Sequence, residues 1–404
     1  SVIAATTSHT HAVVARAPRF GGKLQNFDAS EALALPGVLE VVEVPSGVAV
    51  LAEDSWSAQK GRERLRLEWD DTEAETRSSD EMLESYRRLA AGDDTAIVAL
   101  DTGDVSAGFS QASTEQSFEL SVPFLAHASL EPLNAVIEVD GADIRVFAGC
   151  QLHTLDQWAI ADVFGAKRER VRIETPFTGP SFGRRAYSNS DWIVELAEVA
   201  KASQLGRPIQ VLWTREDDMR GGVYRPMALH RARVGLGSDG HITAWDLLVV
   251  CMSLMKGTPW EQYLLPSGAD RGSIGAVTEL PYRFANHRVF SHTVETPIPV
   301  GFWRSISDRH GLFATEIVMD RMAEVAGTDP FEFRLQHLGS DASRERAVLA
   351  RAVQMAGWGA PLSDGEGLGI ALTKDHVIGK TTHVAMVADV VVDGDRIDVR
   401  RINV

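Results

Sequence analysis

The residue types best suited to chemistry lie in one short run, Thr175 to Arg185, with the sequence TPFTGPSFGRR. Glycines and prolines surround a single aromatic side chain, Phe182, and two adjacent cations follow it. A strand-like VRI precedes the run and an apolar segment with helical spacing follows, so we expect a tight turn between a strand and a helix. Such a turn can present backbone N–H groups to an oxo or phosphate oxygen. A surface turn with a solvated arginine pair is the competing interpretation.

Two further charged side chains lie in apolar surroundings. Glu131 stands in PFLAHASLEP, where a carboxylate needs a partner or acquires a raised pKa. Arg304 follows Trp303 in GFWRS, and a guanidinium there can orient a planar anionic or carbonyl substrate. A structural ion pair is the alternative role for each of these two charges. His127, in the same stretch as Glu131, is expected to be a hydrogen-bonded structural histidine rather than a catalytic one.

Composition narrows the class of protein. The chain has 404 residues, 44% hydrophobic and 24% charged, which predicts a soluble protein of two or three domains. Its formal net charge of −16 argues against nucleic acid as the main partner. No apolar run reaches membrane-spanning length and no signal-peptide layout is present, so we expect a cytoplasmic rather than a periplasmic protein. Two cysteines, Cys150 and Cys251, are too few for an iron–sulfur cluster or a Cys-rich zinc site.

The elements that must position these side chains form a mixed α/β pattern. Residues 12–75 alternate short strands and helices and predict a compact α/β domain, with Asp28 or Ser30 capping its first helix. An acidic, polar stretch then predicts a domain boundary, and a linker with one helix is expected over residues 76–110. The rest of the chain is expected to form one large domain, followed by a separate β-rich segment.

The clearest helix of the sequence follows the TPFTGPSFGRR run. Asn189 or Ser190 is expected to cap it, and Gly206 is expected to end it. Residues 253–282 contain glycine, proline and methionine without a period and are predicted to be irregular. Asp329 and the proline after it predict the start of another helix.

Taken in order, the motifs resemble the molybdenum-binding large subunit of the xanthine dehydrogenase/aldehyde oxidase family, in particular its isoquinoline 1-oxidoreductase type β subunit. The stretches that carry the resemblance are VVARAPRFGGKLQNFDASEALALPGVLEVVEVPSGVAV, VPFLAHASLEPLNA, TPFTGPSFGRRA, GRPIQVLWTREDDMRGGVYRPMALHRAR, IPVGFWRSISDRHG and AGTDPFEFRLQHL. The resemblance implies that residues 12–75 form the family's hammerhead α/β domain and residues 111–340 its first molybdopterin-binding domain. Residues 341–404 are then the incomplete start of a second molybdopterin-binding domain.

The resemblance also implies a reaction. Family members hydroxylate a carbon next to nitrogen in a heteroaromatic ring, or an aldehyde carbon, with water as the oxygen source. They use molybdenum with molybdopterin, usually as the cytosine dinucleotide in bacteria, and pass electrons to [2Fe–2S] clusters that here belong to a partner small subunit. A cytochrome or FAD subunit is the expected electron acceptor. An aldehyde-oxidising subunit and a cofactor-free scaffold or assembly module of the same fold are the alternatives to an N-heteroaromatic hydroxylase.

Matching the motifs to those of the family also implies roles for individual residues. The run from Gly179 matches the family's glycine-rich loop beside the metal's oxo ligand, and no residue is expected to bind the metal directly. The acid of the LEP motif and the Trp-Arg pair match positions that face the substrate in the xanthine branch. The implied site residues are Gly179, Phe182, Gly183 and Arg184 at the cofactor, and Glu131, Trp303 and Arg304 at the substrate.

The sequence departs from the family at three places. The loop is usually GGGFG, whereas Pro180 here removes one N–H group. Leu125 stands where the xanthine branch has a glutamine. The family's catalytic base is a glutamate in a GVGEPG-like motif that this sequence lacks, so we expect no catalytic base within the chain. We therefore expect the chain to be the middle portion of the subunit. The remaining molybdopterin-binding segments are then either on another polypeptide or in a longer chain of which this sequence is only a part.

Overall fold

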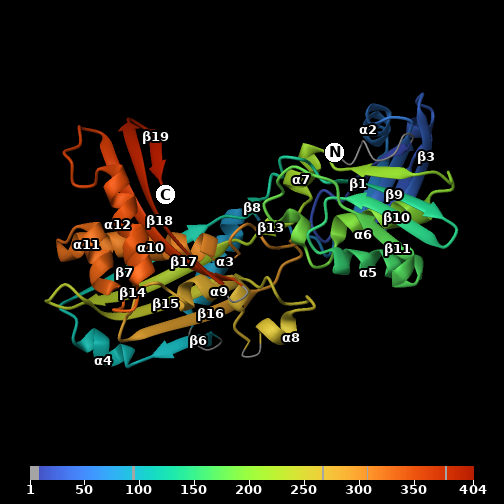
Figure 1. The fold of residues 1–404 in the computed structure, drawn as a ribbon. Helices are drawn as coiled ribbons and strands as arrows, with labels where there is room; N and C mark the ends of the chain where they lie inside the picture. Colours follow the sequence, from blue (N-terminus) through green and yellow to red (C-terminus); the bar gives the residue numbers. More distant parts are fainter. Residues whose placement is uncertain (1–8, 93–95, 266–267, 307, 378–379) are drawn as a thin grey trace. The chain divides into compact units, whose positions relative to one another are not determined.

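The structure is a computed structural model that describes residues 9–92, 96–265, 268–306, 308–377 and 380–404. The chain divides into two compact units, each built from segments that lie far apart in the sequence (Figure 1). Unit 1 contains the described residues up to Ser79 together with Phe124–Pro226 and Glu295–Arg304. Unit 2 contains Asp80–Pro123, Met227–Val294 and Ser305–Val404. Both units combine helices with sheets, so the expected mixed α/β class is confirmed.

Unit 1 is centred on a seven-stranded sheet in the order β11-β10-β9-β12-β1-β4-β3. Its strands are β1 (Thr10–Arg16), β3 (Val38–Val44), β4 (Gly47–Ala52), β9 (Asn134–Asp140), β10 (Asp143–Ala148), β11 (Val171–Glu174) and β12 (Ile209–Leu212). β1 pairs in parallel with β12 and antiparallel with β4. Strands from residues 10–52 therefore share a sheet with strands from residues 134–212. The domain boundaries drawn from the sequence stay predictions.

Helices cover both faces of this sheet. Successive residues of a strand point to opposite faces, and β1 follows this rule. Val13 packs with Ala58 of α2 (Ser55–Glu63) on one face. Val14 belongs to the larger core on the other face, where α5 (His153–Phe164) and α6 (Asp191–Ala202) supply buried side chains such as Ile193.

Smaller elements complete unit 1. Strands β2 (Lys23–Asp28) and β5 (Arg66–Asp70) form a separate antiparallel ribbon, and α1 (Ser30–Leu33) follows β2. Strands β8 (Leu125–Ala126) and β13 (Tyr224–Arg225) pair briefly, and α7 (Arg215–Arg220) precedes β13. The single turn η3 (Arg184–Ala186) connects the glycine-containing run to α6.

Unit 2 contains a five-stranded sheet in the order β6-β16-β15-β14-β7. The strands are β6 (Ile97–Thr102), β7 (Thr114–Val122), β14 (Ala228–Leu236), β15 (Ile242–Met252) and β16 (His287–Val294). One face forms the core with α9 (Arg271–Thr278) and α10 (Asp308–Ala326), while α4 (Val105–Ser110) packs on the other. The helix α3 (Ser79–Ala91) precedes β6.

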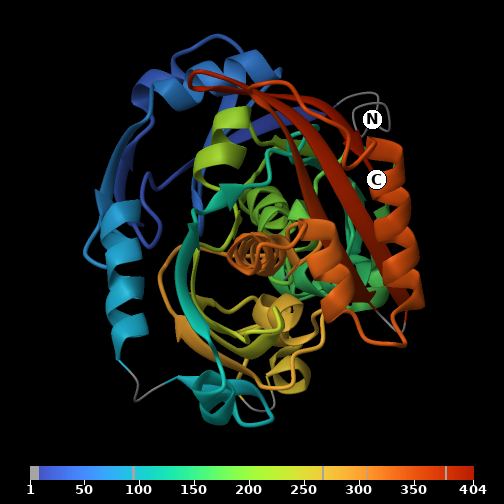
Figure 2. The same cartoon turned by 90° about the vertical axis from the view of Figure 1, so that its left-hand side faces the viewer.

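The last part of unit 2 is a three-stranded antiparallel sheet, β17 (Glu366–Val377), β18 (Lys380–Asp393) and β19 (Arg396–Asn403). The helix α12 (Ser343–Ala356) packs against β18, and α11 (Pro330–His337) lies between α10 and α12 in the sequence. In Figure 2 the red strands of this sheet run beside the orange helices. Asp329 caps α11 through the N–H of Phe331, as the Asp-Pro signal predicted.

Three local predictions are corrected by the structure. The N-cap of α1 is Ala29, not Asp28 or Ser30, because the Asp28 carboxylate accepts the Ser30 N–H in the turn before the helix. Ser190 does precede α6, but the helix ends at Ala202, before Gly206. Residues 253–282, predicted to be irregular, contain α8 (Glu261–Leu264) and α9. The organising contact there is the Asp270 carboxylate, which accepts backbone N–H groups from both sides of the segment, a long-range effect without a sequence period.

Candidate functional site

Two motif-bearing turns meet in unit 1. The N–H of Arg304 donates to the carbonyl oxygen of Phe182 at 2.8 Å, and the Arg304 guanidinium lies 5.8 Å from the centre of the Phe182 ring. A Cβ on Gly183 would lie 2.4 Å from the carbonyl oxygen of Phe302, so this contact requires a glycine. The sequence predicted that both turns belong to one site, and the structure places them against each other.

The turn at Phe182 and Gly183 presents backbone donors. Both residues have positive φ, 56° and 107°, so the chain reverses sharply here. Among the described residues, neither N–H donates to a protein acceptor, whereas the next N–H, of Arg184, bonds back to Ser181. Consecutive N–H groups in a turn of this kind form a concave site for an anionic or oxo oxygen. The turn therefore fits the oxo group of a metal cofactor.

Glu131 fixes the start of the same run. One of its carboxylate oxygens accepts the Gly179 N–H at 2.5 Å, and the other accepts the side-chain amide of Asn134 at 3.1 Å. Burial alone would raise the pKa of Glu131, but these two hydrogen bonds and the charge of Arg185 bring the pKa below its ordinary value. The sequence predicted that Glu131 would have either a polar partner or a raised pKa. The structure shows polar partners, the Gly179 N–H and the Asn134 amide. The roles of Glu131 in substrate binding and of Gly179 in cofactor binding stay predictions.

The two arginines of the run point into the protein. Arg184 is fully buried and forms a bidentate ion pair with Asp191, at 2.9 and 2.5 Å. Arg185 donates to the carbonyl oxygens of Gly179 and Glu131, at 2.8 and 3.1 Å. The solvated arginine pair considered from the sequence is therefore wrong. Arg184 stays a predicted cofactor residue, although its guanidinium already has a partner in Asp191.

His127 joins three segments of unit 1. Its side chain is buried, with Nδ1 2.9 Å from the carbonyl oxygen of Val223 and Nε2 2.7 Å from that of Phe302. The hydrogen-bonded structural histidine expected from the sequence is confirmed. Its second contact lies on the residue that touches Gly183, so it supports the meeting point of the two turns.

Trp303 and Arg304 are more exposed to solvent than the buried Arg184 and Arg185. Arg304 is exposed, and Trp303 is half-buried. The indole Nε1 of Trp303 is buried and has no hydrogen-bond partner among the described residues. A buried donor without an acceptor is uncommon, and a bound ligand is one group that can satisfy it. Both side chains remain predicted substrate contacts.

Two polar residues of the site were missed from the sequence. Ser181 donates its hydroxyl to Gln151 at 3.2 Å, and His153 lies 2.6 Å from the Thr175 hydroxyl. Gln151 and His153 both follow the buried strand β10. Their position could have identified them from the sequence, because polar side chains at the end of a buried strand often line sites. Gln151 and His153 therefore hold Ser181 and Thr175 of the same run whose Gly179 is held by Glu131.

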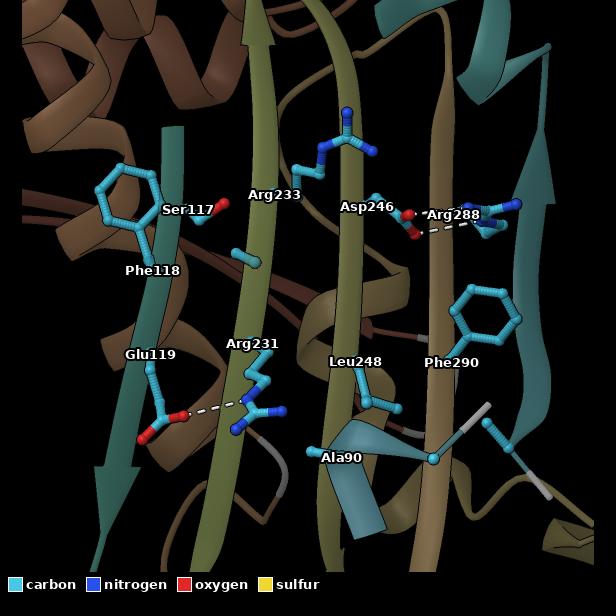
Figure 3. Close-up of a pocket in the computed structure, with 13 residues that line it drawn as sticks. Ala90, Ser117, Phe118, Glu119, Arg231, Arg233, Asp246, Leu248, Arg288 and Phe290 are labelled. Carbon is cyan, nitrogen blue, oxygen red and sulfur yellow. Dashed lines mark hydrogen bonds and ion pairs between the residues drawn. The ribbon is translucent and has the colours of Figure 1, made fainter. Parts of the chain in front are cut away.

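A hollow of about 630 Å³ lies over strands β7, β14, β15 and β16 of the sheet in unit 2 (Figure 3). Figure 3 shows Arg231 reaching Glu119 across neighbouring strands and Arg288 reaching Asp246, at 3.0 and 2.7 Å. Arg233 pairs with Glu115. Its arginines already have carboxylate partners, and it contains none of the predicted site residues. Within the described ranges, no group of three or more His, Cys, Asp or Glu side chains could hold a metal ion.

Comparison with known proteins decides the family. The family model of the molybdopterin cofactor-binding domain matches residues 90–338 of the sequence, which is more than half of the chain. The chain belongs to this family. The resemblance to the xanthine dehydrogenase/aldehyde oxidase group, stated above from the motifs, is thereby confirmed, and the chain is a molybdenum hydroxylase family subunit.

Its relatives are substantially longer. The chain is 27% identical over 391 residues to isoquinoline 1-oxidoreductase subunit beta of Brevundimonas diminuta, covering 94% of this chain and 49% of the relative. It is 26% identical to a membrane-bound aldehyde dehydrogenase (pyrroloquinoline-quinone) of Gluconacetobacter polyoxogenes, covering 93% and 52%. The structure of quinoline 2-oxidoreductase from Pseudomonas putida 86 has the same fold, with a TM-score of 0.70 at 16% identity over 91% of this chain and 54% of that one. The chain thus spans about half the length of these relatives.

In the part of the chain that the structure describes, no helix is both long and apolar enough to cross a bilayer.

Proposed function

We propose that this chain forms one half of the active site of a molybdenum hydroxylase that oxidises a ring carbon next to nitrogen in an N-heteroaromatic substrate, with water as the oxygen source. The observation that carries the proposal is the Phe182–Gly183 turn, whose two N–H groups have no acceptor among the described residues. The Phe302–Arg304 turn lies directly against it. When bound, the molybdenum cofactor supplies the redox chemistry, because it accepts electrons from the substrate carbon.

The residues of the chain divide this work between cofactor and substrate. Phe182 and Gly183 would donate their N–H groups to an oxygen ligand of the cofactor, as preorganised donors that need no rearrangement during the reaction. Arg304 and the Trp303 indole N–H would bind the polar edge of the ring. Glu131 would hold the loop that carries these donors, through its bond to the Gly179 N–H.

The remaining components are proposed from the resemblance of the motifs to the family. The cofactor is molybdopterin, in the cytosine dinucleotide form, and a small subunit carries [2Fe–2S] clusters. A cytochrome or FAD subunit accepts the electrons. Because the chain spans about half of the relatives it matches, the catalytic base and the other molybdopterin-binding segments are assigned to residues outside it.

Aldehyde oxidation is the second candidate. The relative from Gluconacetobacter is named an aldehyde dehydrogenase and is nearly as similar over the same share of the chain as the isoquinoline relative. The side chain that separates the two substrates is Arg304, because a ring nitrogen offers a polar edge to a guanidinium and a simple aldehyde offers only the reacting carbonyl. A cofactor-free scaffold is the third candidate, favoured by Pro180 in the loop and by family motifs that this sequence lacks.

The experiment compares isoquinoline and benzaldehyde as substrates of the assembled complex, wild type and Arg304→Ala. Loss of one charge-assisted hydrogen bond of about 1.5–3 kcal/mol lowers kcat/KM for the heteroaromatic substrate roughly 10- to 100-fold. The value for the aldehyde should change much less. Turnover of benzaldehyde alone would favour the second candidate, and an unaltered kcat/KM for both substrates would make Arg304 a purely structural residue.

A further inference from the structure

We propose that His127 is a permanently cationic imidazolium whose two N–H groups position the Phe302–Arg304 turn. Its ring nitrogens lie 2.9 and 2.7 Å from two backbone carbonyl oxygens, those of Val223 and Phe302. A carbonyl oxygen can only accept a hydrogen bond, and a neutral imidazole carries only one N–H. Both contacts are hydrogen bonds only when both nitrogens carry protons.

The neutral alternative is unfavourable at this position. His127 is 3% exposed, so its ring has little contact with water. A neutral ring would direct a nitrogen lone pair at a carbonyl oxygen less than 3 Å away, which is a repulsive contact between two acceptors. Ser129, two residues further on, donates its N–H to the carboxylate of Asp218, so a negative charge is connected to the same segment.

The chain contains a contrasting histidine in unit 2. His337 is also buried, but its two contacts differ in kind. Nδ1 lies 2.7 Å from the carbonyl oxygen of Phe333, whereas Nε2 accepts the N–H of Ile242 at 3.0 Å. One donor and one acceptor fit a neutral ring, and burial lowers the pKa of His337 accordingly. The contacts therefore predict a doubly protonated ring for His127 and a singly protonated, neutral ring for His337.

The consequence for the site passes through Phe302. Its carbonyl oxygen receives the His127 N–H and lies beside the α-carbon of Gly183. Two residues later, the Arg304 N–H donates to Phe182. Charge-assisted hydrogen bonds are roughly twice as strong as neutral ones, so a cationic ring fixes the register of the two turns more firmly. His127 contacts the backbone of the Phe302–Arg304 turn and acts as a positioning residue; this role, unlike its charge, rests on the proposed function.

Nuclear magnetic resonance of the full chain with ¹⁵N-labelled histidine tests the charge directly at pH 7.5, above the ordinary histidine pKa of about 6.5. The ring signals that disappear in His127→Gln should come from a ring with two protonated nitrogens. Those that disappear in His337→Gln should come from a ring with one. A non-protonated nitrogen in His127 at this pH would overturn the proposal. His127→Asn provides the assignment if the glutamine variant does not fold.

Hydrogen exchange at the Arg304 amide tests the positioning role on the same cofactor-free chain. We expect exchange at least tenfold faster in His127→Phe than in the wild type, and partial recovery in His127→Gln, whose amide can still donate to Phe302. Equal exchange in all three proteins would contradict the role. Because neither measurement uses turnover, an inactive complex with a cationic His127 would disprove the proposed function and leave this inference standing.

Discussion

At the scale of single residues, three polar side chains around the site, Glu131, Arg185 and His127, bind backbone groups. Glu131 accepts an N–H from Gly179, Arg185 donates to two carbonyl oxygens, and His127 contacts two more. Each of these bonds fixes a loop segment that has no regular secondary structure of its own. The loop can therefore hold the N–H groups of Phe182 and Gly183 in place before any ligand arrives.

Gly183 should tolerate no side chain. In Gly183→Ala the new Cβ would meet the Phe302 carbonyl oxygen at 2.4 Å, at a φ of 107°. Backbone strain and the loss of the Arg304–Phe182 hydrogen bond should together cost about 2–4 kcal/mol of unfolding free energy. Gly141→Ala is the control, because Gly141 also has positive φ but nothing lies within 4 Å of its Cβ position, and it should cost only about 1 kcal/mol. Urea unfolding measures both, and equal losses would show that the two turns do not touch.

Glu131 should give the stability of unit 1 a dependence on pH. The folded protein lowers the pKa of this carboxyl, so its stabilising effect is complete above the ordinary value of 4.5 and is lost as the pH falls through the lowered value. Glu131→Gln should therefore cost about 1–2 kcal/mol at pH 7 and much less near pH 3. Glu63→Gln, which removes an exposed partner of Lys60, should cost little at either pH. A cost of Glu131→Gln that does not change with pH would contradict the assignment.

Some residues of the candidate site could be predicted from the sequence, and others could not. The turn at Phe182 and Gly183 and the arginine beside aromatics at Arg304 have local signals in the sequence, while their roles in the site were predicted from the family resemblance. Gln151 and His153 were missed because their partners, Ser181 and Thr175, lie more than a helix away in the sequence. The burial of Arg184 against Asp191 was likewise hidden, since an Arg-Arg pair looks the same in sequence whether solvated or buried.

At the scale of elements, periodic segments were predicted well and segments organised by one distant contact were not. The alternation of β1 and the apolar face of α6 follow directly from side-chain spacing. The segment 253–282 instead depends on Asp270, whose carboxylate accepts the N–H groups of Leu254 and Gly272. Pairing of β1 with β12 also has no local signal, because the partners are about two hundred residues apart.

Helices α10 and α11 should depend on one buried ion pair. The fully buried Arg334 donates to Glu316 at 2.9 Å, and burial raises the pKa of Glu316. Arg334→Ala leaves a buried, uncompensated acid and should cost about 3–5 kcal/mol of unfolding free energy. Arg321→Ala removes an exposed pair with Glu324 on the same helix and should cost less than about 1 kcal/mol. Similar costs for the two variants in calorimetry would show that the buried pair does not hold the helices together.

At the scale of the whole molecule, the proposed function makes the chain one part of a larger site. The chain spans about half of the isoquinoline 1-oxidoreductase relative. Its described residues include the turn proposed to hold the cofactor oxygen, and none of their groups of three or more His, Cys, Asp or Glu could hold a metal ion. On this proposal the cofactor would bring the metal, and the activity would be measured on the assembled complex.

The molybdenum content of the purified complex, measured by mass spectrometry for the wild type, Gly183→Ala and Gly141→Ala, tests the central claim most directly. Stoichiometric molybdenum in the wild type and in Gly141→Ala, with a strong loss in Gly183→Ala, is the predicted result. A folded, intact complex without molybdenum, or one in which Gly183→Ala retains the full amount, would contradict it.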